Sequence, residues 1–460
     1  MSSLILLPFA GAAIVAFLGA ALFTPWVFAS LMVVAQTLLG GAERGAFLGP
    51  IRLGELGLLA ATAGAVLSPR WRFNNLRRCW LNQYVVLYVL TCAVLPLLRW
   101  VITGHGVGLD AIQAYGGAIK GGLVYASVGG LGLNARESRQ VLLVIMFAVV
   151  LSACVAILQW VDYGPVWRIL LTYYKSPHLY MNVQGQYDRA TGLLANWHGL
   201  SVSYAMAMVL GLNLVRGERH LALRRLLVVS LGLVAVGLLA TQTFVAFGSL
   251  LGVGLFLLWQ SLRRRRYRLR VWHALAPLGV VVGAAATLPI LFPERYTFGG
   301  LVPASGYFRL YQWFFLLGPV IREHWLLGYG PFLPAVQVAP GARLVLSDDS
   351  QVISLLLRGG VVALTGWLLL VAATTRHLTL LRLRISTKSA VLDTAFGSTL
   401  ILAAASLLQS FFNYTGVLEF YWVLLAMSRP ELARDQSDSG ESIAGPSAAP
   451  PPAATPVLAT

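Results

Sequence analysis

The sequence predicts an all-α, polytopic integral membrane protein with about 12 transmembrane helices. Of its 460 residues, 58% are hydrophobic and 11% are charged, whereas about a quarter of a soluble domain is charged. The mean hydropathy is +0.74. Apolar stretches of roughly 20 residues, the length that a helix needs to cross a bilayer, recur along the chain. A transmembrane barrel would instead show short alternating segments.

The order of the spans follows from the hydropathy between short basic loops. The predicted spans are 4–22, 25–40, 52–68, 83–98, 112–131, 140–160, 197–215, 223–240, 243–259, 271–291, 352–374 and 391–409, with a shorter segment at 417–428. Thr24 and Pro25 interrupt the apolar run at the amino end, and the last segment is short for a span. The first span is followed by no cleavage site of the A-x-A type, so we expect it to be retained.

The distribution of charge predicts the topology. Lys and Arg total 34 against 17 Asp and Glu, a net charge of +17. The loops richest in arginine are 69–82, 216–225, 261–270 and 375–388. The positive-inside rule makes them cytoplasmic. The run Arg263 to Arg266 could alternatively bind phosphate or RNA, but we interpret it as a topology signal and expect no nucleic-acid partner.

Two long loops, 161–196 and 293–351, then face the other side of the membrane, which is the periplasm if the host is a bacterium with an inner membrane. They are the most polar and aromatic parts of the folded chain, and long ordered loops are usually functional. We divide the chain into a membrane domain, 1–433, and a disordered cytoplasmic tail, 434–460, which is rich in Ser, Pro and Ala.

Three polar constellations lie at the outer ends of the predicted spans. Arg189 precedes Gly192 and a helix that begins near His198. Arg309 lies in a predicted amphipathic helix. Asp348 and Asp349 directly precede a span. Guanidinium groups and helix N-termini favour anions such as phosphates. A carboxylate at a helix start is often only an N-cap, and that reading stays open for both aspartates; beside two arginines, either one could accept the proton of an attacking hydroxyl.

The order and spacing of three sequence elements resemble the O-antigen ligase and O-antigen polymerase superfamily of bacterial membrane glycosyltransferases. They are Arg189 to Asn196 before a span, Arg309 and Trp313 upstream of Leu326-Leu327-Gly328-Tyr329-Gly330, and Asp349 three turns before Gly359-Gly360. The resemblance covers about 185–375. It implies glycosyl transfer with inversion, without metal or cofactor, from an undecaprenyl-diphosphate-linked oligosaccharide in the bacterial cytoplasmic membrane, with the active site on the outer face.

The sequence departs from that pattern at two places. Ligases of the superfamily carry a histidine where Asp349 stands, which favours the polymerase branch over the alternative of a ligase that joins the glycan to lipid A core or another acceptor. Many members carry a serine-arginine pair where this chain reads Thr241-Gln242-Thr243, so Arg322, among others, is a candidate for a further phosphate contact. A polysaccharide chain-length regulator is a possible partner.

Further residues are candidates for substrate binding. Tyr187, Tyr307, Tyr311 and Trp313 are candidates for stacking on sugars, unless they only form an aromatic belt at the headgroup level. His198 and His324 either contact substrate or are hydrogen-bonded inside the bundle.

Lys120, in mid-span, is costly in lipid, so we expect it to face a cavity or a partner and treat it as a candidate for lining the polyprenyl-phosphate path. The three cysteines show no metal or disulfide spacing. The competing class is a transporter or flippase of lipid-linked sugar, whose signature would be buried charges and helices broken at mid-membrane.

Overall fold

The computed structural model describes the chain in the following ranges: 24–42, 53–77, 79–106, 108–174, 177–184, 189–194, 196–243, 245–246, 248–249, 252–254, 256, 296–297, 302–332, 335–339, 342–345, 350–384, 389–407, 409–411 and 416–428. The predicted spans 4–22 and 271–291, most of 243–259, the loop 261–270 and the tail 434–460 lie outside these ranges.

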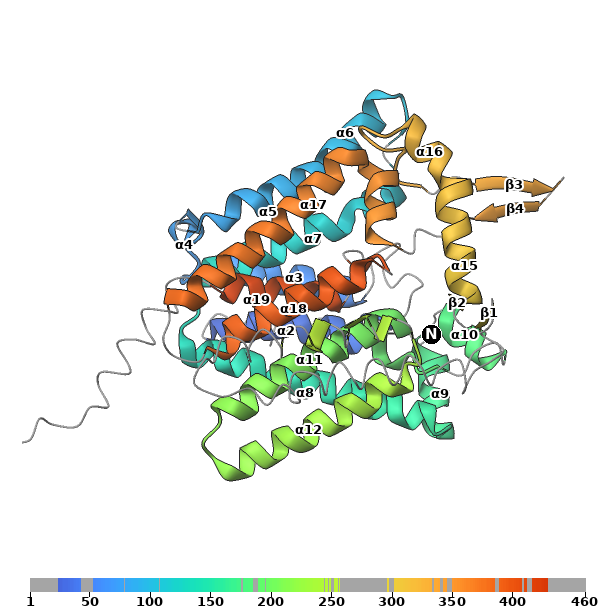
Figure 1. Ribbon diagram of the computed structural model, residues 1–460. Helices are drawn as coiled ribbons and strands as arrows, with labels where there is room; N and C mark the ends of the chain where they lie inside the picture. Colours follow the sequence, from blue (N-terminus) through green and yellow to red (C-terminus); the bar gives the residue numbers. More distant parts are fainter. Residues whose placement is uncertain are drawn as a thin grey trace, which may run out of the picture.

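The described chain is a helical bundle (Figure 1). Its helices are α2 (Pro25–Leu39), α3 (Leu53–Leu67), α4 (Phe73–Arg77), α5 (Leu81–Val89), the π-helix η1 (Leu90–Val94), α6 (Leu95–Ile102), α7 (Leu109–Leu131), α8 (Ala135–Trp160), α9 (Gly164–Tyr173), α10 (Pro177–Val183), the 3-10 turn η2 (Gly192–Leu194), α11 (Trp197–Gly217), α12 (Leu221–Ala240), α15 (Ala304–Tyr311), the π-helix η4 (Gln312–Leu317), α16 (Gly318–Glu323), α17 (Gln351–Arg384), α18 (Ala390–Ser406) and α19 (Val417–Met427).

Two short antiparallel hairpins accompany the helices. Strand β1 (Tyr296–Thr297) pairs with β2 (Val302–Pro303), and β3 (Ala335–Ala339) pairs with β4 (Ala342–Val345). Both lie within one of the two long loops, so the bundle itself is all-helical.

Five of the described helices are long and apolar enough to cross a membrane by length and composition. They are Leu81–Ile102, Ala135–Trp160, Trp197–Gly217, Leu221–Ala240 and Gln351–Leu383. Shorter apolar helices occupy four further predicted spans: α2, α3, α18 and α19. The chain is therefore a helical membrane protein, while the total of about 12 spans stays a prediction.

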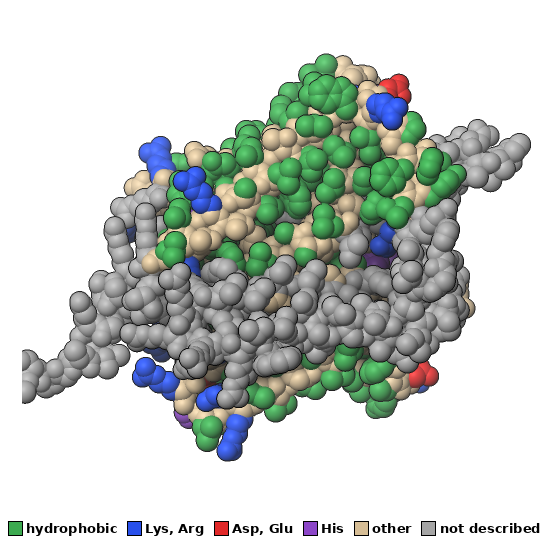
Figure 2. Space-filling view, viewed as in Figure 1, with side chains coloured by type: hydrophobic (Ala, Val, Ile, Leu, Met, Phe, Trp, Pro, Cys, Tyr) green, Lys and Arg blue, Asp and Glu red, His purple; other side chains and the backbone are tan. Residues whose placement is uncertain are grey.

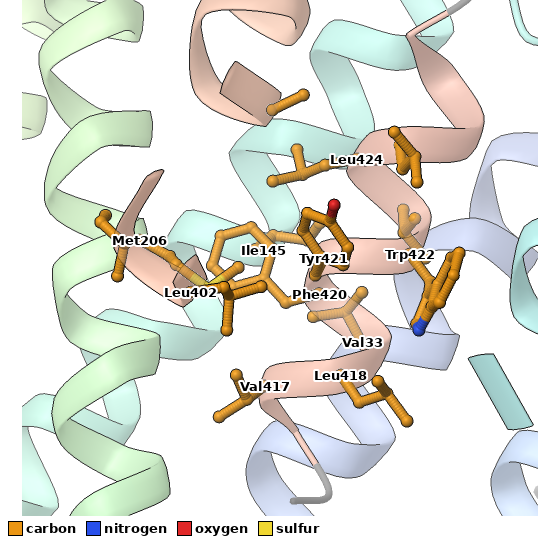
Figure 3. Packing of buried hydrophobic residues seen from close by; sticks show 14 of the residues in the cluster. Val33, Ile145, Met206, Leu402, Val417, Leu418, Phe420, Tyr421, Trp422 and Leu424 are labelled. Carbon is orange, nitrogen blue, oxygen red and sulfur yellow. The ribbon is translucent and has the colours of Figure 1, made fainter. Parts of the chain in front are cut away.

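Helix α19 is the centre of the bundle rather than a marginal last segment. All 11 of its residues are buried, as expected for a helix that is apolar on every side. Figure 3 shows its side chains Phe420, Tyr421 and Trp422 among residues of the surrounding helices, including Ile145 of α8 and Met206 of α11. A helix of this length rises about 16 Å, too little to cross a hydrocarbon core of about 30 Å.

The basic loops of the described chain lie at one end of the bundle. Arg70, beside α4, pairs with Glu137 at the start of α8 at 2.5 Å, and Arg139 of α8 pairs with Glu218 in the α11–α12 turn. Asn134 and Glu137 also form a reciprocal capping box at the start of α8, at 2.9 and 3.0 Å. Figure 2 shows basic side chains gathered at the end that carries α4, which is the arrangement that the positive-inside rule requires.

Helix α17 is broken, which the sequence did not indicate for the predicted span 352–374. Gly360 has φ +64° and ψ −160°, a conformation restricted in practice to glycine. The segment that follows α16 supplies the hydrogen bonds lost at the break. The N–H of Tyr329 donates to the carbonyl of Leu357, and the N–H of Val361 donates to the carbonyl of Trp325 at 2.8 Å.

The break requires close backbone contact. A Cβ on Gly360 would lie 2.3 Å from the carbonyl carbon of Leu326, and a Cβ on Gly328 (φ +76°) would lie 2.5 Å from the backbone nitrogen of Gly359. The structure thus packs the Leu326–Gly330 motif directly on the Gly359-Gly360 pair.

We predict that Gly360→Ala lowers the free energy of unfolding by at least about 1–3 kcal/mol, because alanine is strained at this φ and ψ and meets Leu326. Thermal unfolding of the detergent-purified protein measures it. The control is Gly232→Ala in α12, where an added Cβ meets nothing within 4 Å and stability should be kept or raised. Equal midpoint temperatures of thermal unfolding for the two variants would contradict the prediction.

Candidate anion-binding site

The two long loops meet at the end of the bundle opposite to α4. Figure 1 shows α9 and α10 from the first loop and α15, α16 and the two hairpins from the second at this end. The rod formed by α15, η4 and α16 ends against the broken part of α17. Residues far apart in the sequence lie close together there, as Arg99 and Leu327 do.

Buried hydrogen bonds fix the segment that carries Arg189. The side-chain oxygen of Gln159, at the end of α8, accepts from the backbone N–H groups of Thr191 and Gly192 at 2.9 and 3.0 Å. The N–H of Ala190 donates to the carbonyl of Ala240 at 3.0 Å. Gly192 has φ +50°, so the chain turns sharply into η2. Arg189 is thus held between the ends of α8 and α12.

Helix α11 starts at this site with a side-chain cap. The side-chain oxygen of Asn196 accepts from the N–H groups of His198 and Gly199 at 2.9 and 3.1 Å. This is the usual way to satisfy the free donors of a first helical turn. The cap orients the first turn of α11, which carries His198, relative to Arg189.

One arginine and two histidines lie around Trp197. The Arg189 guanidinium lies 5.4 Å from the centroid of the Trp197 ring, and the His178 ring lies 4.2 Å from it. The rings of His178 and His198 are 6.3 Å apart. Both Arg189 and Arg309 are near enough for their charges to act on His198. Its Nδ1 is buried and has no hydrogen-bond partner in the described part of the chain.

Helices α9 and α10 hold His178 in place through a small cluster of their own. Leu170 and Leu179 are buried there with Tyr174 and Ala42. The Tyr174 hydroxyl donates to the carbonyl of Leu38 at 2.7 Å, which ties α9 to the end of α2. Burial raises the pKa of Tyr174 to about 12, so this hydroxyl keeps its proton at neutral pH.

Two more arginines lie at the break in α17, where they bind carbonyl groups. Arg99 donates to the carbonyl of Leu327 at 3.1 Å, and Arg358 donates to the carbonyl of Ala114 at 2.8 Å. The Tyr115 hydroxyl donates to the carbonyl of Arg358 at 3.1 Å. These contacts stabilise the irregular backbone of the break.

The remaining predicted residues of the second loop have separate surroundings. Trp313 packs against the small core of Leu317 and Leu357, so it anchors η4 to α17. Tyr311 is 45% exposed and lies against Phe315, with ring centroids 5.4 Å apart.

The other two predicted contacts of this loop lie in and after α16. Arg322 is exposed on this helix. His324 caps its C-terminal end and lies 5.4 Å from the Tyr329 ring. Neither residue is among those whose charges act on His198.

Four predicted residues cannot be placed in the site. Asp348, Asp349 and Tyr187 lie outside the described residues, as does the side chain of Tyr307. Within the described ranges, no group of three or more His, Cys, Asp or Glu residues is placed to hold a metal ion.

Lys120 has a charged partner inside the bundle. It forms an ion pair with Glu55 of α3, and its charge also acts on the buried Glu419 of α19. Glu419 accepts from the N–H of Gly416 at 2.6 Å, within the capping box of α19. The expected partner of Lys120 is therefore Glu55, and a place for Lys120 on a substrate path stays a prediction.

Three residues of the site were not predicted as site residues from the sequence. They are His178, Trp197 and Gln159. Trp197 precedes His198 directly, and its contact with Arg189 was a foreseeable cation–π pair. Gln159 and His178 gave no comparable signal, because only the fold brings the end of α8 and helix α10 to Arg189.

No protein-family model matches the chain, and no curated protein matches its sequence. The family resemblance therefore rests on the motifs themselves.

We predict that Asn196→Ala lowers the free energy of unfolding by about 1 kcal/mol, because it leaves the first N–H groups of α11 without their cap. Asn196→Asp keeps an acceptor oxygen at the same place and should restore the stability. The measurement is thermal unfolding of the purified protein. An aspartate variant as unstable as the alanine variant would show that the cap does not hold α11.

Proposed function

We propose that this protein is a membrane glycosyltransferase of the bacterial cytoplasmic membrane, which polymerises undecaprenyl-diphosphate-linked oligosaccharides on the outer face. The observation that carries the proposal is that Arg189 lies over the Trp197 ring at the start of α11, where the charge of Arg309 from the second loop also acts on His198. Two guanidinium groups beside a helix N-terminus suit the diphosphate of a lipid-linked sugar.

The proposed reaction is a displacement at the anomeric carbon of the donor. A hydroxyl of the acceptor sugar forms the new carbon–oxygen bond while the bond to the diphosphate breaks, so the configuration inverts. Arg189 and Arg309 stabilise the negative charge that develops on the departing undecaprenyl diphosphate. The acceptor proton goes to a nearby base, and the transfer needs no metal ion.

Two kinds of side chain are candidates for that base. Asp349 and Asp348 are the candidates from the sequence. His198 is the titratable group that lies with both arginines, and its buried Nδ1 has no hydrogen-bond partner in the described chain. We therefore treat His198 as an equal candidate, with His178 beside it.

The acceptor decides between the two forms of the proposal. A second lipid-linked repeat unit as acceptor makes the protein a polymerase, with a chain-length regulator as its candidate partner. Lipid A core or another acceptor makes it a ligase. The aspartate at position 349 favours the polymerase.

We predict that purified protein in detergent, given lipid-linked repeat units, forms a ladder of longer glycans. Arg189→Gln and Arg309→Gln should each lower the initial rate about 100-fold or more, because each removes a charge that binds the leaving group. Gel electrophoresis of the labelled glycans measures this. The control is Arg219→Gln, an exposed arginine in the α11–α12 turn, which should keep the wild-type rate.

The same assay separates the candidate bases. His198→Asn and Asp349→Asn are compared over a pH series, with thermal unfolding as a check on folding. The base is the residue whose substitution lowers the rate of ladder formation and removes the pH dependence of the remaining rate. Transfer only after lipid A core is added would identify a ligase. Full activity of both arginine variants would contradict the assignment of the site.

A transporter of lipid-linked sugar is the second candidate, and the structure holds two observations in its favour. Lys120, Glu55 and Glu419 bring charge into the bundle, and such residues often mark a transport path. Helix α17 is broken at Gly360, and a π-helix, η1, precedes Pro96. Broken helices are frequent at transport sites.

If the protein is a transporter, proteoliposomes should exchange labelled lipid-linked sugar across the membrane without any change in glycan length. Glu419→Gln should then slow the exchange, since it removes a charge from the cluster. If the protein is the proposed transferase, no exchange is expected, and Glu419→Gln should still form the ladder. Exchange without a ladder would reverse the ranking of the two candidates.

A further inference from the structure

A groove of about 630 Å³ lies on the outside of the bundle between α4, α5 and α7. Most of its lining is apolar and includes Val86, Leu90 and Leu123, which are 56%, 42% and 44% exposed. Its polar lining residues include Arg77 of α4, Asn82 and Gln83 in the first turn of α5, and Tyr125 of α7, whose hydroxyl donates to the Asn82 side chain at 2.7 Å. The groove therefore has one polar end and one apolar end.

The polar end lies at the basic end of the bundle. Arg77 is exposed and lines the groove. Trp80 also lines it, and the guanidinium of Arg376 lies 5.8 Å from the centroid of the Trp80 ring. One guanidinium group thus lines the polar end of the groove, its mouth, and a second lies beside a ring that lines it, and guanidinium groups bind phosphates well.

The length of the groove fits one leaflet of a bilayer. Its lining residues on α5 and η1 run from Asn82 to Leu90, a rise of about 12 Å. Half of a hydrocarbon core of roughly 30 Å is about 15 Å. A lipid with its phosphate at the mouth would therefore place its acyl chain along the groove.

The mouth is held by hydrogen bonds between the α4 region and α7. The Trp71 ring nitrogen donates to the carbonyl of Ala126 at 3.3 Å, and the Asn75 side chain donates to the carbonyl of Gly130 at 2.9 Å. Helix α4 carries Arg77 and is thereby fixed against α7 without any ligand. Little ordering is needed on binding, which favours affinity.

We propose that this groove binds an acidic phospholipid from the leaflet on the basic side of the membrane. Its phosphate lies between Arg77 and Arg376, and one acyl chain lies against Val86, Leu90 and Leu123. Basic pockets between transmembrane helices bind acidic lipid head groups in this way. The site is at the opposite end of the bundle from Arg189, and the proposal does not depend on the glycosyl transfer.

The test is native mass spectrometry of the full-length protein in detergent, titrated with phosphatidylglycerol or phosphatidylcholine of the same acyl chains. We expect phosphatidylglycerol to bind about 10- to 30-fold more tightly, from two arginines near the phosphate. The double variant Arg77→Gln/Arg376→Gln should reduce that ratio to near one. Val86→Trp, which fills the groove at an exposed position, should weaken the binding of both lipids.

The matched control is Arg219→Gln/Arg224→Gln, which removes the same charge from two exposed arginines, one in the α11–α12 turn and one in the first turn of α12, and should keep the preference. Three results would overturn the proposal. They are equal binding of the two lipids by the wild type, an equal loss in the control variant, and unchanged phosphatidylglycerol binding by Val86→Trp. Thermal unfolding of each variant shows that it is folded.

Discussion

The need to pair every backbone polar group inside a bilayer governs the part of the bundle around α17. A helix broken within a span exposes N–H and C=O groups that lipid cannot satisfy. Here Trp325 to Gly330 supply those partners at the break beside Gly360, and Arg99 and Arg358 bind carbonyl groups around it. The second loop is thereby fixed to the membrane domain, and α15, which carries Arg309, is connected to this fixed point through η4 and α16.

The same requirement shapes the first loop. Gln159 satisfies two buried N–H groups just after Arg189, and Asn196 satisfies the first N–H groups of α11. Each polar contact removes freedom from a short segment whose side chains would otherwise be mobile. Arg189 and His198 are held by backbone that is already ordered, and such preorganisation makes electrostatic stabilisation of a developing charge effective.

Charge is distributed over three depths of the molecule, and the physical role differs at each. At the basic end, arginines pair with Glu137 and Glu218 on the outside of the bundle, where both arginines are more than half exposed. Inside the bundle, Lys120 pairs with Glu55, since an isolated charge there would be costly. At the opposite end, Arg189 lies over the Trp197 ring, in a segment that Gln159 holds by hydrogen bonds.

The sequence by itself determined the class of fold and, apart from the carboxyl end of α17, the positions of the described span helices within a few residues. Hydropathy over about 20 residues reflects transfer into lipid and needs no tertiary contact. Only the tertiary structure decided that α19 is the centre of the bundle, that α17 breaks at Gly360, and that His178 and Gln159 belong to the site. These depend on side chains that meet across distant helices, and no local pattern encodes such contacts.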